Sequence, residues 1–267
     1  MKIKKEKPDY SPEHLAYLKK QRNKKLIVHL SRAFLLIAIL GIWELLAQLK
    51  AVNPFITSSP SRVCVTLASL YTEGTLFYHI GITLMETLVG FVLAVVVGYA
   101  VAVVLWASET VRKVLEPYIV VLNSLPKIAL GPLIIIWIGT GYDAIIFMTV
   151  LVSVIVCIMN MLAGFIAVDK TKLTLMKSMG ASRITTLRKL IIPASLPALM
   201  NTLKVAVGLA WIGSIMGEYI VSKAGLGYLI VYGGQVFKLD LVMTATYILC
   251  VLAGGMYALS NTHLRAH

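Results

Sequence analysis

The chain has 267 residues, of which 58% are hydrophobic and 14% are charged, and its mean hydropathy is +0.85. A soluble domain is about 45–50% apolar and about 25% charged, so this composition excludes an ordinary soluble enzyme, a disordered chain and a nucleic-acid-binding domain. We therefore interpret the formal net charge of +13 as a sign of how the chain is oriented in a membrane, and not as a sign of a nucleic-acid partner.

Six apolar segments are long enough to cross a bilayer, because a helix needs roughly 20 apolar residues to span a hydrocarbon core about 30 Å thick. They cover residues 30–49, 80–106, 118–138, 144–168, 193–220 and 239–260. The third segment contains Pro126 and Pro132 beside Lys127, so we expect its helix to be kinked or broken early. The sequence thus predicts an all-α membrane protein with six transmembrane helices.

Connections rich in Lys and Arg alternate with connections poor in them along the chain. Nine Lys and Arg residues precede the first span and six lie in the connection 169–192, whereas the turn Gly139–Asp143 has none. The positive-inside rule then places both termini and the connections 107–117 and 169–192 in the cytoplasm. We expect a basic N-terminal segment (residues 1–29), a transmembrane domain (30–262) and a short tail (263–267).

Two spans carry small residues at helical spacing. Gly90, Ala94, Gly98 and Ala102 recur every four residues in the second span. The fifth span repeats the pattern with Ala206, Ala210 and Ser214, beside Gly213 and Gly217. Stripes of this kind let two helices approach closely, so they predict a packed helical bundle.

The connection 169–192 is mixed in polarity and lies between two apolar spans. Apolar residues recur at three-residue spacing on both sides of Gly180, as Leu173, Met176, Met179 and then Ile184, Leu187, Leu190. This pattern predicts two short amphipathic helices with Asp169 and Ser182 as N-caps, and Pro193 as the start of the fifth span. Gly180, between the two helices, is expected to end the first of them with a positive φ, where glycine carries no Cβ penalty. Such helices can dock into the cleft of a partner protein, or they can lie on lipid headgroups.

The same stretch carries a family resemblance. Met179-Gly180-Ala181-Ser182, followed by Leu-Ile-Ile-Pro-Ala-Ser-Leu-Pro at 190–197, resembles the EAA loop of ABC-importer permeases. Several further segments resemble the nitrate/sulfonate/taurine-type branch: Pro126-Lys127-Ile128-Ala129-Leu130, Trp137–Gly141, Asn160 with Gly164, Gly208–Trp211, Glu218 and Gly225-Leu226-Gly227. The resemblance extends from about Ser59 to Gly227.

The resemblance implies a MetI-like permease fold, a permease homodimer, two ATPase subunits and an extracytoplasmic binding protein. It implies a small solute: a sulfonate, taurine, nitrate, bicarbonate or a heterocyclic vitamin precursor. The residues expected to couple the chain to the ATPase are Thr174, Met176, Lys177, Gly180, Ala181, Ser182 and Pro193. Thr174-Leu175-Met176 stand where the family usually has Glu-Ala-Ala, so this chain lacks the glutamate at that position of the contact.

Polar groups at bilayer depth are costly and need a partner or water. We expect Lys127, Trp211 and Glu218 to border the translocation path. For Lys127 the alternative is snorkelling to the interface, and for Glu218 it is an interfacial position or capping of the Gly217–Gly227 turn. Glu44 and Glu86 are expected to be structural partners of other spans.

No catalytic or cofactor-binding pattern is found. Cys64, Cys157 and Cys250 lie far apart, without a CxxC pair or a zinc-type Cys/His cluster. The sequence lacks a Gly-x-x-x-x-Gly-Lys-Ser/Thr phosphate loop, so we expect ATP and Mg²⁺ to bind on a separate ATPase and no cofactor on this chain. An ion-gradient-driven transporter is the alternative; it would need inverted repeats and a midplane ion site, and no convincing repeat relates the two halves.

Overall fold

The computed structural model describes residues 11–264, and the residues within this range form helices without any β-strand. The predicted all-α class is therefore confirmed. The helices are α1 (Pro12–Gln48), α2 (Pro54–Thr57), α3 (Pro60–Thr72), α4 (Leu76–Ala107), α5 (Glu109–Ser124), η1 (Lys127–Leu130), α6 (Gly131–Ile138), α7 (Tyr142–Ile166), α8 (Lys170–Ser178), α9 (Arg183–Thr186), η2 (Leu187–Ile191), α10 (Ile192–Val221), α11 (Leu226–Gln235) and α12 (Leu239–Leu264).

The chain forms two compact units, residues 1–62 and 63–267, which are described separately. In the first unit, α1 begins at Pro12 and runs without a break through residue 29, because the Lys and Arg residues between positions 19 and 25 are also good helix formers. Its apolar side chains, among them Leu30, Phe34 and Ile37, are exposed, as expected of a helix that faces lipid. The first ten residues of the predicted N-terminal segment and the last three of the predicted tail lie outside the described residues.

Glu44, near the end of α1, has a structural role within the first unit. Its carboxylate accepts hydrogen bonds from the backbone N–H of Ser61 at 3.0 Å and from the Ser61 hydroxyl at 2.9 Å. Gln48 donates a further hydrogen bond at 3.0 Å. Glu44 therefore has a structural role, but its partners lie on α1 itself and on the short helix α3 and not on another span as expected.

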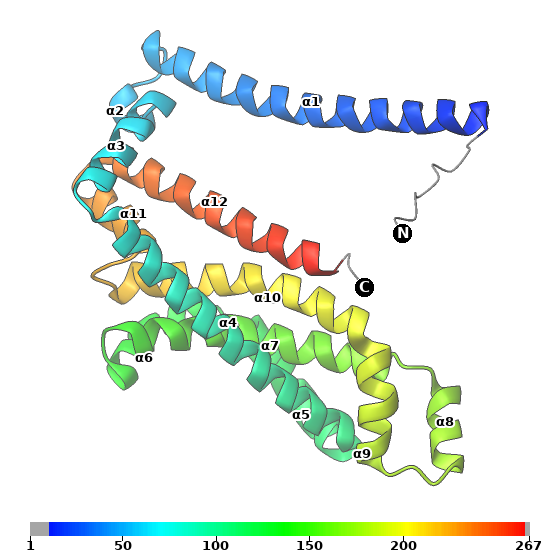
Figure 1. Ribbon diagram of the computed structural model, residues 1–267. Helices are drawn as coiled ribbons and strands as arrows, with labels where there is room; N and C mark the ends of the chain where they lie inside the picture. The colour runs from blue at the N-terminus through cyan, green and yellow to red at the C-terminus, as the bar shows by residue number, and fades with distance from the viewer. Residues whose placement is uncertain (1–10, 265–267) are drawn as a thin grey trace, which may run out of the picture. The chain divides into compact units, whose positions relative to one another are not determined.

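Three long helices, α4, α7 and α10, pack against one another at the centre of the second unit (Figure 1). The small residues of α4 are buried, and a Cβ added to Gly98 would lie 2.7 Å from the Cβ of Cys157 on α7. On α10, a Cβ added to Gly213 would lie 2.6 Å from the Cα of Thr149. Glycine lets these backbones meet directly, so both predicted stripes are packing faces.

The third apolar segment is broken, as predicted. α5 and the η1–α6 helix meet at an angle of 87°. The break lies at Leu125 and Pro126, where Leu125 is extended because the proline ring disfavours a helical residue before it. Five helices are long and apolar enough to cross a membrane, and the described residues offer six spans if the bent pair counts as one.

One helix of the second unit was not predicted. The sequence indicated only a turn between Gly217 and Gly227, but α11 begins at Leu226 and packs against α12. Leu226 and Leu229 of α11 are buried with Leu241 and Ala245 of α12. A ten-residue helix without a capping side chain at its own start leaves little local signal in the sequence.

Candidate functional site

The connection 169–192 starts with the short helix α8, which Asp169 caps as predicted. The Asp169 carboxylate accepts a hydrogen bond from the backbone N–H of Thr171 at 2.8 Å, and this bond lowers the pKa of the Asp169 carboxyl. Leu173 and Met176 are half-buried on one side of α8, whereas Thr174 and Lys177 are exposed. α8 is therefore an amphipathic helix with an outward polar face.

Gly180 ends α8 in a Schellman turn. Its φ is +71°, and its N–H donates to the carbonyl oxygen of Lys177 at 2.9 Å. The next N–H, that of Ala181, donates to the carbonyl oxygen of Met176 at 3.0 Å. This pair of bonds defines the motif, and glycine adopts its left-handed backbone without a Cβ penalty. The prediction of a positive φ at Gly180 is confirmed.

Ser182 caps the next helix, also as predicted, by accepting a hydrogen bond from the N–H of Thr185 at 3.2 Å. The residues around the turn expose large apolar side chains. Leu175 is 61% exposed, Met179 is 73% exposed and Ile184 is 71% exposed. The apolar residues of the predicted repeats therefore fall into two groups. Leu173, Leu187 and Leu190 pack on the core, whereas Met179 and Ile184 face outward.

The second predicted amphipathic helix is not a separate helix, and this corrects the sequence interpretation. One helix runs from Arg183 to Val221 through a π-helical turn at Leu187–Ile191 (Figure 1). Pro193 falls in the first turn of α10, directly after the π-helical turn, where a missing N–H is tolerated. Pro193 therefore marks an irregular turn inside a continuous helix.

A second contact ties this connection to the helical core. The guanidinium group of Arg183 donates a hydrogen bond to the carbonyl oxygen of Ala107 at 2.7 Å. Ala107 is the last residue of α4, and its carbonyl is one of those that a helix leaves without an internal partner. A cation is favourable at this negative end of the helix dipole. The connection is thus attached to α4 as well as to α10.

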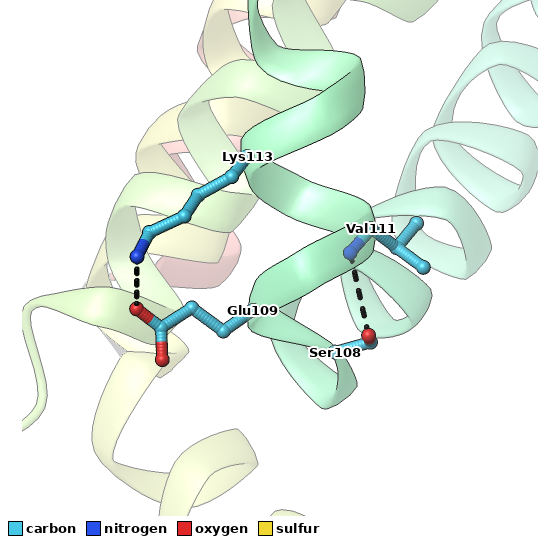
Figure 2. Close-up of polar contacts among 4 residues, drawn as sticks. All are labelled: Ser108, Glu109, Val111 and Lys113. Carbon is cyan, nitrogen blue, oxygen red and sulfur yellow. Dashed lines mark hydrogen bonds and ion pairs between the residues drawn. The ribbon is translucent and has the colours of Figure 1, made fainter.

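The corner that follows Ala107 is held by short-range contacts (Figure 2). Ser108 caps α5 by accepting a hydrogen bond from the N–H of Val111 at 3.4 Å. One turn along, Lys113 and Glu109 form an exposed ion pair at 2.9 Å, which solvent screening makes a minor contribution to stability. Arg183 therefore contacts α4 beside a capped corner.

Glu218 lies near the end of α10 and is only 1% exposed. Its Oε2 atom accepts hydrogen bonds from the backbone N–H of Gly227 at 2.6 Å and of Tyr228 at 3.3 Å. These bonds match the capping alternative, in a form that the sequence did not reveal: the carboxylate holds the start of α11. A place for Glu218 on the translocation path stays a prediction.

The other two residues predicted on the path have different surroundings. Lys127 lies at the break between α5 and η1, where its Nζ donates to the carbonyl oxygen of Asn123 at 3.3 Å. Trp211 is 6% exposed and lies two turns from Glu218 on α10. Their role on the path also stays a prediction.

The sequence did not reveal the surroundings of two residues, Arg183 and Glu86. Arg183 was counted only as a positive charge, and its contact with Ala107 joins positions 76 residues apart. Glu86 was expected to be a structural partner of another span; it is fully buried beside Glu218 of α10, but neither of its carboxylate oxygens has a hydrogen-bond partner among the described residues. The sequence did indicate that Glu86 would be buried, because Glu86 lies four residues before Gly90 and so on the same helix face as the small-residue stripe.

Comparison with known proteins extends this picture. The family model for the binding-protein-dependent transport system inner membrane component matches residues 90–264 of this chain. The chain belongs to this family. The match includes α10 and the whole connection 169–192, so the resemblance inferred from the sequence is confirmed.

Curated members of the family are similar over most of their length. The taurine transport system permease protein TauC of Escherichia coli strain K12 is 27% identical over 223 residues, covering 82% of this chain and 81% of TauC. The "Probable ABC transporter permease protein" of Haemophilus influenzae is 31% identical over 232 residues, covering 86% of this chain and 94% of that protein.

A solved structure shows the fold. The structure of the MetNI methionine ABC transporter in an inward-facing conformation contains a chain that matches with a TM-score of 0.66. The alignment is 20% identical and covers 73% of this chain and 97% of that chain. The matched part of the chain therefore has the MetI-like permease fold.

Proposed function

We propose that this chain is the permease subunit of an ATP-driven importer and forms the translocation path for a small solute. Two copies of the chain would form the path, two ATPase subunits would drive it, and an extracytoplasmic binding protein would deliver the solute. ATP and Mg²⁺ would bind on the ATPase, and this chain would carry no cofactor and perform no chemistry.

The observation that supports this proposal most strongly is the turn at Gly180. Three large apolar side chains, Leu175, Met179 and Ile184, are exposed around it although residues on both sides pack on the core. Exposed apolar patches with a polar rim are typical of protein interaction sites. Here the rim is basic, since Lys177 and Arg183 lie in the same stretch.

The attachment of this turn to the core suggests how motion would pass through it. A force applied to α8 and α9 would reach α10 through the π-helical turn, and α4 through Arg183 and Ala107. Because α4, α7 and α10 meet through small residues and direct backbone contact, they would move as rigid bodies. Closure of the ATPases would thus reorient the spans around the path.

We further propose that the solute is small and anionic or heterocyclic, such as a sulfonate, taurine, nitrate, bicarbonate or a vitamin precursor. The similarity to a taurine permease supports this class. The distribution of Lys and Arg supports an orientation in the bacterial plasma membrane with both termini and the connection 169–192 in the cytoplasm. Labelling of cysteines introduced at Glu73 and Ser182 tests this orientation: Ser182 must be inaccessible from outside intact cells.

The functional proposal is tested by reconstituting the chain with its ATPase and binding protein in proteoliposomes. We expect solute uptake to require ATP on the ATPase side and to persist without an ion gradient. Uptake driven by a gradient alone would contradict the proposal. The double variant Met179→Asp with Ile184→Asp should lose the ATPase during co-purification, whereas Phe237→Asp, which removes an equally exposed apolar group outside the connection, should retain it.

A further inference from the structure

Two carboxyl groups, those of Glu86 on α4 and Glu218 on α10, lie in the same part of the interior of the second unit. Thr83, one turn before Glu86, and Glu218 accept hydrogen bonds from the adjacent backbone N–H groups of Leu226 and Gly227, at 2.8 and 2.6 Å. Glu86 is 0% exposed and Glu218 is 1% exposed. Both lie within helices that are long and apolar enough to cross a membrane. Two buried carboxylates at this depth cannot both be ionised without a compensating cation.

The start of α11 favours the ionised form of Glu218. The first backbone N–H groups of this region all donate to side chains of other helices: Gly225 to His79 at 2.9 Å, Leu226 to Thr83 at 2.8 Å, and Gly227 to Glu218 at 2.6 Å. The N–H groups of Gly227 and Tyr228, which both donate to Oε2 of Glu218, and the helix dipole favour a negative charge on Glu218. Glu218 is therefore the member of the pair that is suited to be the anion.

The remaining oxygen atoms of the pair lack partners. Oε1 of Glu218 and both carboxylate oxygens of Glu86 are buried and without a hydrogen bond among the described residues. A buried acceptor without a donor is costly. One proton on Glu86, directed to Oε1 of Glu218, would give both groups a hydrogen-bond partner.

We propose that Glu86 and Glu218 form a proton-binding pair that joins α4, α10 and the start of α11. Glu86 holds the proton, and ionised Glu218 accepts from it while also accepting from the N–H groups of Gly227 and Tyr228. The proposal does not depend on the identity of the transported solute or on the ATPase. Loss of the proton would leave two adjacent negative charges, which would drive α4 away from α10 and α11.

None of the other titratable groups around the pair supplies a positive charge that could take the place of the proton. Tyr142 at the start of α7 interacts with Glu86, and Tyr219 on α10 interacts with Glu218. On α4, His79 accepts a hydrogen bond through Nδ1 and stacks on Tyr228 of α11. Among the described residues, no lysine or arginine contributes to the electrostatics of either carboxyl.

Infrared spectroscopy of the purified chain in lipid nanodiscs tests the proposal directly. We expect the carbonyl band of a protonated carboxylic acid at neutral pH, shifted in D₂O, and lost in Glu86→Gln. The matched control is Glu73→Gln, which removes an exposed glutamate outside the pair and should leave the band intact. Absence of the band in the parent chain, or its full retention in Glu86→Gln, would overturn the assignment.

Thermal unfolding at several pH values gives a second, independent readout. An exposed glutamate is ionised above about pH 4.3, so above this pH the folded chain would carry one proton more than the unfolded chain. Stability should then fall as the pH rises, with the unfolding equilibrium constant of the parent chain increasing up to about tenfold per pH unit relative to Glu86→Gln. Equal slopes for the two chains would contradict the proposal. Stabilisation of the parent chain by added Na⁺ would also contradict it, since a cation would then hold both carboxylates.

Discussion

The guanidinium of Arg183 donates a hydrogen bond to the carbonyl oxygen of Ala107, 2.7 Å away and 76 residues earlier in the chain. The contact joins the connection 169–192 to the final residue of α4. Since the same connection follows α7 directly along the chain and continues into α10 through a π-helical turn, all three central helices are attached to it. A docked partner that moves the connection would therefore act on α4 and α10 together.

We expect Arg183→Gln to weaken the transmission of motion while the chain stays folded. Arg183 is exposed, so the lost bond is worth about 1 kcal/mol, and uptake should fall by roughly fivefold. Arg188→Gln is the matched control because it removes the same charge from an exposed position on the same connection. Solute uptake by both variants in proteoliposomes checks the prediction, and an equal loss in both would reduce the role of Arg183 to that of a general positive charge.

A second prediction concerns the contact between α10 and α7. A methyl group at position 213 would lie 2.6 Å from the backbone Cα of Thr149, so Gly213→Ala must push the helices apart. Overpacking of this kind costs about 1–3 kcal/mol. Gly208→Ala, on the same helix, meets nothing within 4 Å and should be neutral or stabilising by up to about 1 kcal/mol. Melting temperatures in detergent should therefore move in different directions, and a similar drop in both variants would contradict the assigned packing face.

Features set by neighbouring residues were predictable from the sequence. The caps at Asp169 and Ser182 and the left-handed Gly180 were all predicted, because each depends on a few adjacent residues. The small-residue stripe of α4 was predicted for the same reason, since its period is a property of one helix. The break at Pro126 follows from the chemistry of proline alone.

Features that depend on distant residues were not predictable. The start of α11 has no capping side chain of its own and is held by His79, Thr83 and Glu218, which come from α4 and α10. The continuity of the helix through Pro193 depends on the π-helical turn before it. A proline usually signals a boundary, and the compensating turn has no comparable sequence signature.

The start of α11 gives a third prediction. Gly225 has a φ of +112°, and a Cβ there would collide with the carboxyl group of Glu218. Gly225→Ala should therefore separate α11 from Glu218 and destabilise the chain by about 1–3 kcal/mol. Gly234→Ala, near the other end of α11, meets nothing within 4 Å and serves as the control. Protease accessibility of α11 should increase only in Gly225→Ala, and increased cleavage in both variants would argue against a specific anchor at Glu218.

The fourth prediction concerns Gly180, where the effect of the backbone conformation can be tested separately from steric clashes within the chain. Its φ is +71°, yet a Cβ at this position would meet nothing within 4 Å of this chain. Gly180→Val should therefore act through the left-handed backbone, at a cost of about 1–2 kcal/mol, and through obstruction of a docked partner. We expect the variant to remain in the membrane, because no span is altered, but to lose ATPase binding and uptake.

Gly180→Asn is the matched control for this prediction, because asparagine tolerates the left-handed conformation better than other side chains. If the backbone conformation is what matters, Gly180→Asn should retain most of the ATPase during co-purification while Gly180→Val does not. If both variants lose the ATPase, the absence of a side chain at the contact matters more than φ. If both retain the ATPase and normal uptake, the turn rests on lipid headgroups and the connection 169–192 is not the docking element.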